Sequence, residues 1–196
     1  MSDLIDELVG IAPGDPLDAL RAKRPTAKAD AQATYDALIA APRDLARASA
    51  VERVAIGYWV AVLSSAGRLS AHYRDLLAGL DPAVLAALDA AAAGALTAGP
   101  YGSFPPGPLS VEDEDGLHWT APAELRDAIG PRLAAALEHA HLLTYRLRDS
   151  SPDALQALLD AGWTTDGIVT VSQLIAFTHF QLRVVAGLTV LKEQQR

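Results

Sequence analysis

Residues 49–73, SAVERVAIGYWVAVLSSAGRLSAHY, decide the fold of this chain. Ser49 and Glu52 form an S-x-x-E capping box, in which the hydroxyl and the carboxylate each accept from a backbone N–H at a helix start. Every residue from 54 to 63 is apolar, aromatic or Gly, so a helix here has no polar face and should be covered on all sides. Residues 64–68 break this core helix, and a second, more polar helix is expected to begin at Ser70.

The composition favours one helical domain. A chain of 196 residues is long enough for one good core and too short for two. Hydrophobic residues make up 51% of the sequence but aromatic residues only 6%, so the core must consist of Ala, Leu and Val. Small aliphatic side chains suit closely packed helices, and the sequence therefore predicts an all-α fold.

Charge and cysteine content exclude several classes of function. A formal charge of −8 argues against binding to nucleic acid or to an anionic membrane surface. The apolar run 54–67 is shorter than the roughly 18 residues of a membrane span, and the acidic N-terminus does not resemble a signal peptide, so we expect a soluble, cytoplasmic protein. The absence of cysteine excludes disulfides, thiolate nucleophiles and iron–sulfur clusters.

The chain divides into a short N-terminal arm, residues 1–25, and a helical domain, residues 26–196. Residues 3–11 and 16–23 read as two short helices forming an arm or lid. The other expected helices span residues 26–40, 82–98, 122–129, 131–147, 152–161 and 169–192. Residues 99–121 form a Pro-rich, acidic loop, which is expected either to act as a lid or a subunit arm or to be disordered.

Glu52 and His72 are the first candidates for chemistry. Glu52 either caps its helix or, with a pKa raised by burial, relays protons. His72 follows the break near Ser64 and Ser65, and it is either a catalytic base or a hydrogen-bonded helix residue. An unbroken helix places Glu52 roughly 18 Å from Ser64. The two candidates could share a site only if the helix breaks near Gly57 or a neighbouring subunit contributes one of them.

The remaining histidines give no metal motif. His139 and His141 are two residues apart and point in different directions on a helix, whereas zinc binding by one helix uses an i,i+4 pair. His118 lies in the acidic loop and is expected in solvent, and His179 is a core or interface residue or shares a pocket with His72. No G-x-S-x-G, Walker A or G-x-G-x-x-G motif is present.

The core stretch resembles the motif of the AhpD-like superfamily, which includes carboxymuconolactone decarboxylase. In that motif a Glu is followed by Cys-x-x-Cys and then by a His. Here Glu52 is followed by the apolar helix, the break and His72 in the same order. Residues 155–164, LQALLDAGWT, and 176–183, AFTHFQLR, are similar to the L-x-x-A-G-[FW] turn and F-N-x-x-N-R helix of peroxidase-related members. The resemblance covers residues 26–191 and implies helical trimers or hexamers that reduce alkyl hydroperoxides through the cysteines.

This chain departs from the family at the reactive positions. Ser65 and Arg68 stand where the resemblance implies cysteines, and the separation of Glu and His is one residue longer. A serine hydroxyl neither ionises near neutral pH nor forms sulfenic intermediates, so we predict no thiol peroxidase activity. We also predict no cofactor and no metal. The resemblance implies a pocket lined by Ser64, Trp59 and His179.

Two functions fit this pattern. The first is an oligomeric protein that binds a small ligand in the old pocket or pairs with a cysteine-bearing AhpD-like relative. The second is a decarboxylase or lyase using Glu52 and His72 on a small acidic lactone. A homo-oligomer is also expected, since 51% hydrophobic residues exceed what one small core hides. The lyase needs an inward cation, for which the candidates are Arg53, Arg68, Arg74 and Arg183.

Overall fold

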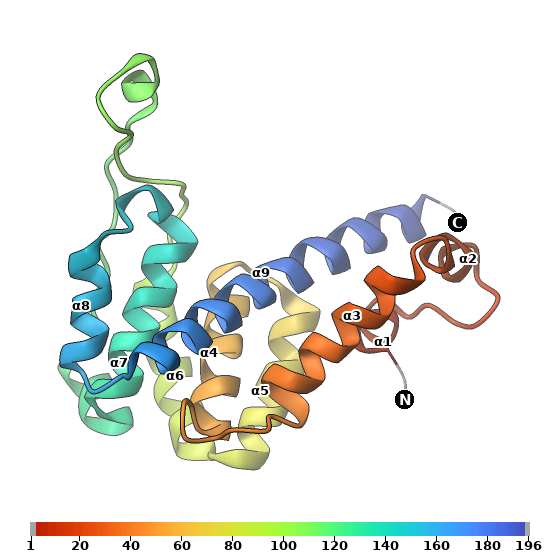
Figure 1. Ribbon diagram of the computed structural model, residues 1–196, viewed down its shortest axis with the longest axis horizontal. Helices are drawn as coiled ribbons and strands as arrows, with labels where there is room; N and C mark the ends of the chain where they lie inside the picture. Colours follow the sequence, from red (N-terminus) through yellow and green to blue (C-terminus); the bar gives the residue numbers. More distant parts are fainter. Residues whose placement is uncertain (1–2, 195–196) are drawn as a thin grey trace.

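A computed structural model describes residues 3–194 and confirms the all-α prediction, since this part of the chain contains helices and no strand. Figure 1 shows the helices around α4 at the centre. The α-helices are α1 (Leu4–Val9), α2 (Pro16–Ala22), α3 (Pro25–Tyr35), α4 (Ala50–Leu63), α5 (Gly67–Leu80), α6 (Pro82–Ala95), α7 (Ala123–Tyr145), α8 (Pro152–Asp160) and α9 (Thr165–Glu193). The π-turn η1 (Asp36–Ala40) extends α3, and η2 (Pro108–Glu112) and η3 (Leu147–Asp149) are short 3₁₀ turns.

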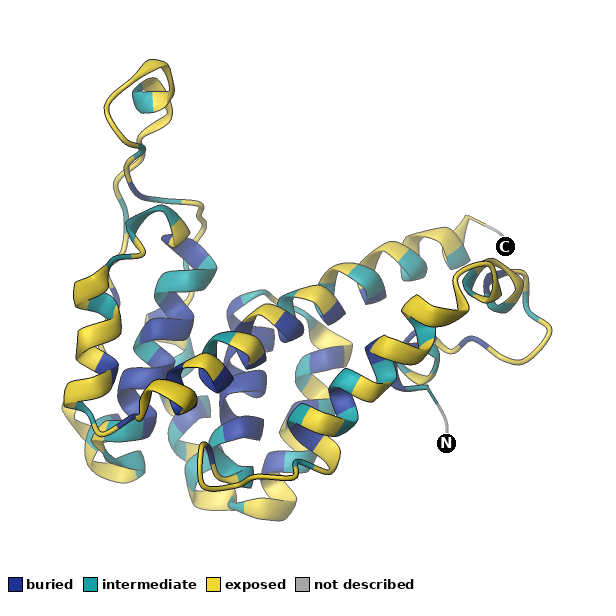
Figure 2. Ribbon diagram, in the orientation of Figure 1, coloured by how far each residue is buried: buried dark blue, intermediate teal, exposed yellow. Residues whose placement is uncertain are grey.

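Helix α4 is the core helix that the sequence predicts. The capping box is formed, because Ser49 Oγ accepts from the Glu52 N–H at 3.2 Å and Glu52 Oε2 accepts from the Ser49 N–H at 2.7 Å. Helices α5, α6, α7 and α9 surround α4, which is buried along almost its whole length (Figure 2). The remaining helices are organised around this central element.

Helix α4 continues through Gly57 without a break, so the helix break that would bring Glu52 and His72 together is absent. Gly57 instead permits close packing, since a Cβ at this position would lie 2.6 Å from the ring of Tyr73 on α5. The Tyr73 hydroxyl donates to Gln181 Oε1 of α9 at 2.7 Å, and both side chains are buried. One ring therefore joins α4, α5 and α9.

The turn between α4 and α5 is shorter than expected. Ser65 adopts a left-handed conformation with φ of 54°, and α5 begins at Gly67 rather than at Ser70. The single left-handed residue reverses the chain within three residues, so helical geometry resumes early. Ser65 is a non-glycine residue with positive φ, which is a strained conformation characteristic of tight turns and functional sites.

Two later helix boundaries also follow from single residues. Gly130 leaves helical geometry with φ of 79°, and the chain restarts at Pro131 as predicted, giving α7 its kink. Helix α9 begins at Thr165, before the predicted residue 169, because Thr164 Oγ1 accepts from the Gly167 N–H at 3.1 Å and caps the helix. Helix α6 ends at Ala95, short of the predicted residue 98.

The N-terminal helices pack on the far end of α9. Figure 1 shows α1 and α2 beside the C-terminal half of α9, with α3 leading from there toward α5. This region has a small apolar cluster of its own, made by Ile5, Val9, Ile11, Leu17, Ala31 and Val185. The predicted arm is therefore packed against the domain by a second apolar core.

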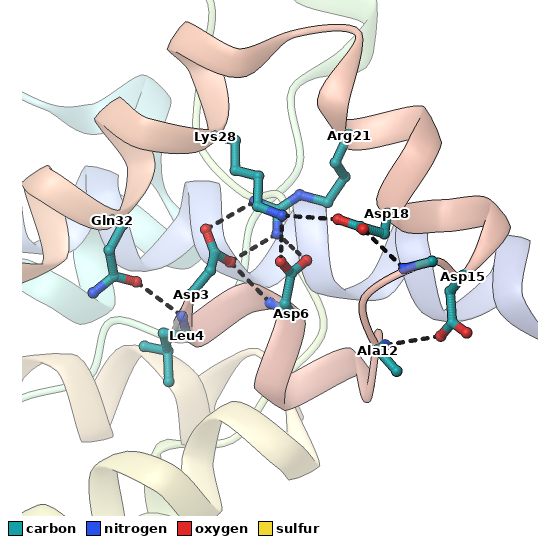
Figure 3. A network of polar contacts seen from close by, with 10 residues as sticks. Asp3, Leu4, Asp6, Ala12, Asp15, Asp18, Arg21, Lys28 and Gln32 are labelled. Atoms are coloured by element: carbon teal, nitrogen blue, oxygen red, sulfur yellow. Dashed lines mark hydrogen bonds and ion pairs between the residues drawn. The ribbon is translucent and has the colours of Figure 1, made fainter. Parts of the chain in front are cut away.

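A network of ion pairs connects the helices of this arm (Figure 3). Arg21 forms ion pairs with Asp3 at 2.7 Å and with Asp6, while Lys28 pairs with Asp6 at 2.6 Å and with Asp18 at 3.3 Å. Burial acts to lower the pKa of Arg21, but the hydrogen bonds from the two aspartates outweigh burial and raise this pKa. The network ties α1 and α2 to the start of α3.

The loop 99–121 projects from the body of the molecule, as the green segment of Figure 1 shows. Its two sides meet at an isolated bridge between Gly102 and Glu114, and most of the loop is exposed (Figure 2). Polar contacts hold its base, where Asp149 Oδ1 accepts from the Ser103 N–H at 3.2 Å and Arg146 donates to the Gly116 carbonyl at 2.9 Å. The middle of the loop points away from the body, whereas its returning end, at Trp119, packs into the core.

Helix α9 qualifies the sequence argument against a membrane span, which rested on the shorter apolar run of α4. Helix α9 has the length and the mean hydropathy, 1.6 over 18 residues, of a helix that could cross a membrane. It nevertheless packs on α4, α1 and α8, and the core helix of a soluble protein meets the same criterion. The described residues give no clear sign of a membrane protein, and the cytoplasmic location stays a prediction.

Candidate functional site

Glu52 acts as a structural tie in this structure. Besides capping α4, its Oε1 accepts from Nε of Arg132 at 2.8 Å. The Arg132 guanidinium lies 3.9 Å from the ring centre of Trp163, and its other nitrogens donate to backbone carbonyls. Glu52 therefore caps α4, as one of its two interpretations predicts. Through Arg132 it also links the start of α4 to α7 and to the α8–α9 turn.

His72 is bound to the N-terminal part of the chain. Its Nε2 lies 2.9 Å from the hydroxyl of Tyr35, at the end of α3. Burial lowers the pKa of His72, and burial also raises the pKa of Tyr35 to about 12, so both groups are neutral near pH 7. Glu52 and His72 share neither a polar partner nor a cavity among the described residues. The chain on its own does not assemble them into an acid–base pair.

Trp59 is fully buried in the core and is not among the residues that line the cavity formed by Ser64, Ser65 and His179. Its ring centre is 5.1 Å from that of Trp119, and its buried Nε1 has no hydrogen-bond partner within residues 3–194. Trp119 in turn stacks on His141 at 5.5 Å. Trp59 is thus part of an aromatic cluster between α4 and α7.

Ser64, Ser65 and His179 do meet at one cavity, which we call the serine cavity. Its volume is about 610 Å³, and it lies between the α4–α5 turn, the end of α7 and the middle of α9. Pocket volumes of roughly 300–1,000 Å³ are typical of small-molecule sites. Its polar lining residues are Ser64, Ser65, Thr144, Tyr145, His179 and Arg183, and its apolar side chains include Leu63, Leu182 and Ala186.

The electrostatics of the serine cavity favour an anion. Burial, together with the nearby Arg183, lowers the pKa of His179, so the imidazole is neutral at pH 7. His179 Nε2 lies 3.2 Å from the Thr144 hydroxyl, and Arg183 Nη1 donates to the His179 carbonyl at 3.0 Å. No carboxylate is among the lining residues, so Arg183 supplies the one formal charge of the described lining.

The other three arginines that could have supplied a cation are engaged elsewhere. Arg53 is buried and donates to the carbonyls of Leu38, Asp44 and Ala48. Arg74 pairs with Asp89 at 2.7 Å on the surface. Arg68, at the position where the resemblance implies a cysteine, donates to a carbonyl of α1 at 2.8 Å and does not line the serine cavity.

Two residues of the serine cavity, Thr144 and Tyr145, were not singled out from the sequence. Both lie at the C-terminal end of α7, where the Tyr145 hydroxyl donates to the Leu63 carbonyl. Burial raises the pKa of Tyr145, which keeps this hydroxyl a neutral donor. No motif marks them, because they reach the cavity only through the packing of α7 beside the α4–α5 turn.

Comparisons of the chain with protein-family models, curated proteins and solved structures find no match. The resemblance to the AhpD-like superfamily therefore rests on the sequence motifs alone. Among the described residues no group of three or more His, Asp or Glu side chains is arranged to hold a metal ion.

Proposed function

We propose that the protein binds a small organic acid in the serine cavity, as a cysteine-free relative of the AhpD-like proteins. The observation that carries this proposal is that Arg183, Ser64, Ser65 and His179 line one cavity, whose lining contains no carboxylate. The net charge of the chain is −8, but this lining carries one positive charge and no negative charge, which favours an anionic ligand. The ligand carboxylate would contact Arg183 and a serine hydroxyl, and Leu182 and Ala186 would contact its apolar part.

Binding rather than covalent catalysis fits the contacts in this cavity. A serine nucleophile needs a base within hydrogen-bond reach, but the partner of His179 is Thr144 and not Ser64 or Ser65. Thiol-dependent peroxide reduction also lacks its nucleophile, because the chain contains no cysteine. The alternative lyase, which uses Glu52 and His72, is now proposed only in the form where a neighbouring subunit completes the site.

Isothermal titration with hexanoate and with uncharged hexanol tests the proposal. We expect hexanoate to bind more tightly, and Arg183→Gln to weaken hexanoate binding by about tenfold or more, as the loss of a charged hydrogen bond implies. Arg43→Gln is the matched control, because it removes the same charge at an exposed position outside the cavity. Equal binding of the two ligands, or an unchanged affinity in Arg183→Gln, contradicts the proposal.

Self-association is proposed on separate grounds. Helices α8 and α9 expose large apolar side chains on their outer surfaces, including Leu155, Leu159, Val169 and Phe180. Association of these faces, as the predicted homo-oligomer, trimer or hexamer, would remove them from water. Light scattering of the purified protein distinguishes such an oligomer from a monomer.

A further inference from the structure

A second cavity lies between α7, α8 and the returning end of the projecting loop. We call it the histidine cavity, because His118, His139 and His141 all border it. Its volume is about 210 Å³, and it shares no lining residue with the serine cavity. The exposed residues His118 and Thr120 stand at its edge and leave a route from solvent.

His139 brings unused hydrogen-bonding capacity to this cavity. The residue is only 5% exposed, yet its Nδ1 is buried with no hydrogen-bond partner among the described residues. A buried N–H without an acceptor is costly, so the stable tautomer carries its proton on Nε2. His141 differs, because its Nε2 is 3.0 Å from the Ala95 carbonyl and is already satisfied. In this tautomer the Nε2–H of His139, a residue that lines the cavity, makes no hydrogen bond within the described residues.

The charges around the histidine cavity are compensated within the protein. Glu138 pairs with Arg126 at 2.6 Å and accepts from the Ala121 N–H at 2.8 Å. Arg146 pairs with Asp149 at 2.7 Å. Burial lowers the pKa of His139, so this imidazole is neutral near pH 7. A charged ligand would lose its hydration here and find no unpaired group of opposite charge, so the cavity favours an uncharged ligand.

The lining contains two stacked aromatic rings beside aliphatic side chains. The rings of Trp119 and His141 stack at 5.5 Å with 28° between their planes, and Leu142 and Ala154 complete the wall. An apolar cavity of about 150 Å³ in an engineered protein holds one benzene molecule. A cavity of 210 Å³ accordingly holds a single substituted ring, and aromatic ligands pack well against such rings.

We propose that the histidine cavity is a second binding site, specific for small uncharged aromatic molecules that carry a hydrogen-bonding oxygen, such as phenols. The ring packs between α7 and α8 near Trp119, and the oxygen accepts a hydrogen bond from His139 Nε2. This site is distinct in charge from the serine cavity, where Arg183 favours an anion. The two proposals can be tested independently, because the two cavities differ in their lining residues and in their proposed ligands.

Isothermal titration with phenol, toluene and benzoate tests this inference. We expect phenol to bind the native protein, and Ala157→Phe, which fills the cavity from an exposed position on α8, to abolish that binding. Ala186→Phe is the matched control, because it adds the same ring in the serine cavity and should leave phenol binding unchanged. Phenol binding that survives Ala157→Phe overturns the assignment of the site.

The role of His139 is tested by the ratio of phenol to toluene affinity. His139→Leu should lower this ratio by about tenfold, as expected for the loss of one hydrogen bond, while toluene binding is retained. An unchanged ratio overturns the polar part of the inference. Benzoate should lose no affinity in Ala157→Phe, and a benzoate site that Ala157→Phe removes contradicts the selection for uncharged ligands.

Discussion

Replacing Gly57 by Ala perturbs the closest helix contact in the core. In a helix interior this substitution normally stabilises a protein by roughly 0.5–1 kcal/mol. Here the new methyl would lie 2.6 Å from Tyr73 Cε1, and this ring is fully buried, so it can move only by displacing its neighbours. Overpacking of this kind costs about 1–3 kcal/mol, and a displaced ring also loses its hydrogen bond to Gln181, worth about 1 kcal/mol. We expect a net destabilisation of about 1–3 kcal/mol.

Urea denaturation followed by circular dichroism measures this change as a shift of the midpoint at constant slope. Gly187→Ala is the matched control, because Gly187 lies within α9 and a methyl added there would have no neighbouring atom within 4 Å, so this variant should be slightly stabilised. In a Tyr73→Leu background the cost of Gly57→Ala should shrink, as expected for two coupled neighbours. A Gly57→Ala variant that gains as much stability as Gly187→Ala refutes the packing argument.

Other variants test separate parts of the structure. Arg53→Met should lower the free energy of unfolding by about 2–4 kcal/mol in urea denaturation, because three carbonyls lose their buried donor, and Arg53→Lys should recover only part of this loss. Ser65→Val should destabilise the protein by more than about 1 kcal/mol, since a β-branched residue tolerates the φ of 54° poorly, and Ser65→Gly should not. The free energy of unfolding should fall as the pH drops below the ordinary histidine pKa of 6.5, because burial lowers the pKa of His139 and the unfolded chain therefore binds the proton first. His139→Gln should reduce the difference in unfolding free energy between about pH 7.5 and about pH 5.5. The native chain should not consume cumene hydroperoxide with a dithiol reductant, and turnover that His72→Ala abolishes would show that the cysteine argument is wrong.

The candidate site shows which of the residues singled out from the sequence lie together and which do not. The motif around the α4–α5 break pointed to Ser64 and Ser65, and these serines do border a cavity with His179. The same motif joined Glu52 to His72, but the structure gives them different partners, Arg132 and Tyr35. Sequence spacing fixes positions along a helix, whereas a partner from another helix depends on how the helices cross.

The sequence by itself determined the local elements of this protein. The capping box at Ser49 and Glu52, the uninterrupted apolar run of α4 and the kink at Gly130 all act through contacts within a few residues, which is why they could be read directly. Only the tertiary structure decided which distant side chains meet. Arg183 lines the same cavity as the two serines, and Tyr73 packs on Gly57, because helix crossings and side-chain volumes bring these residues together. No local rule of hydrogen bonding or periodicity predicts such contacts.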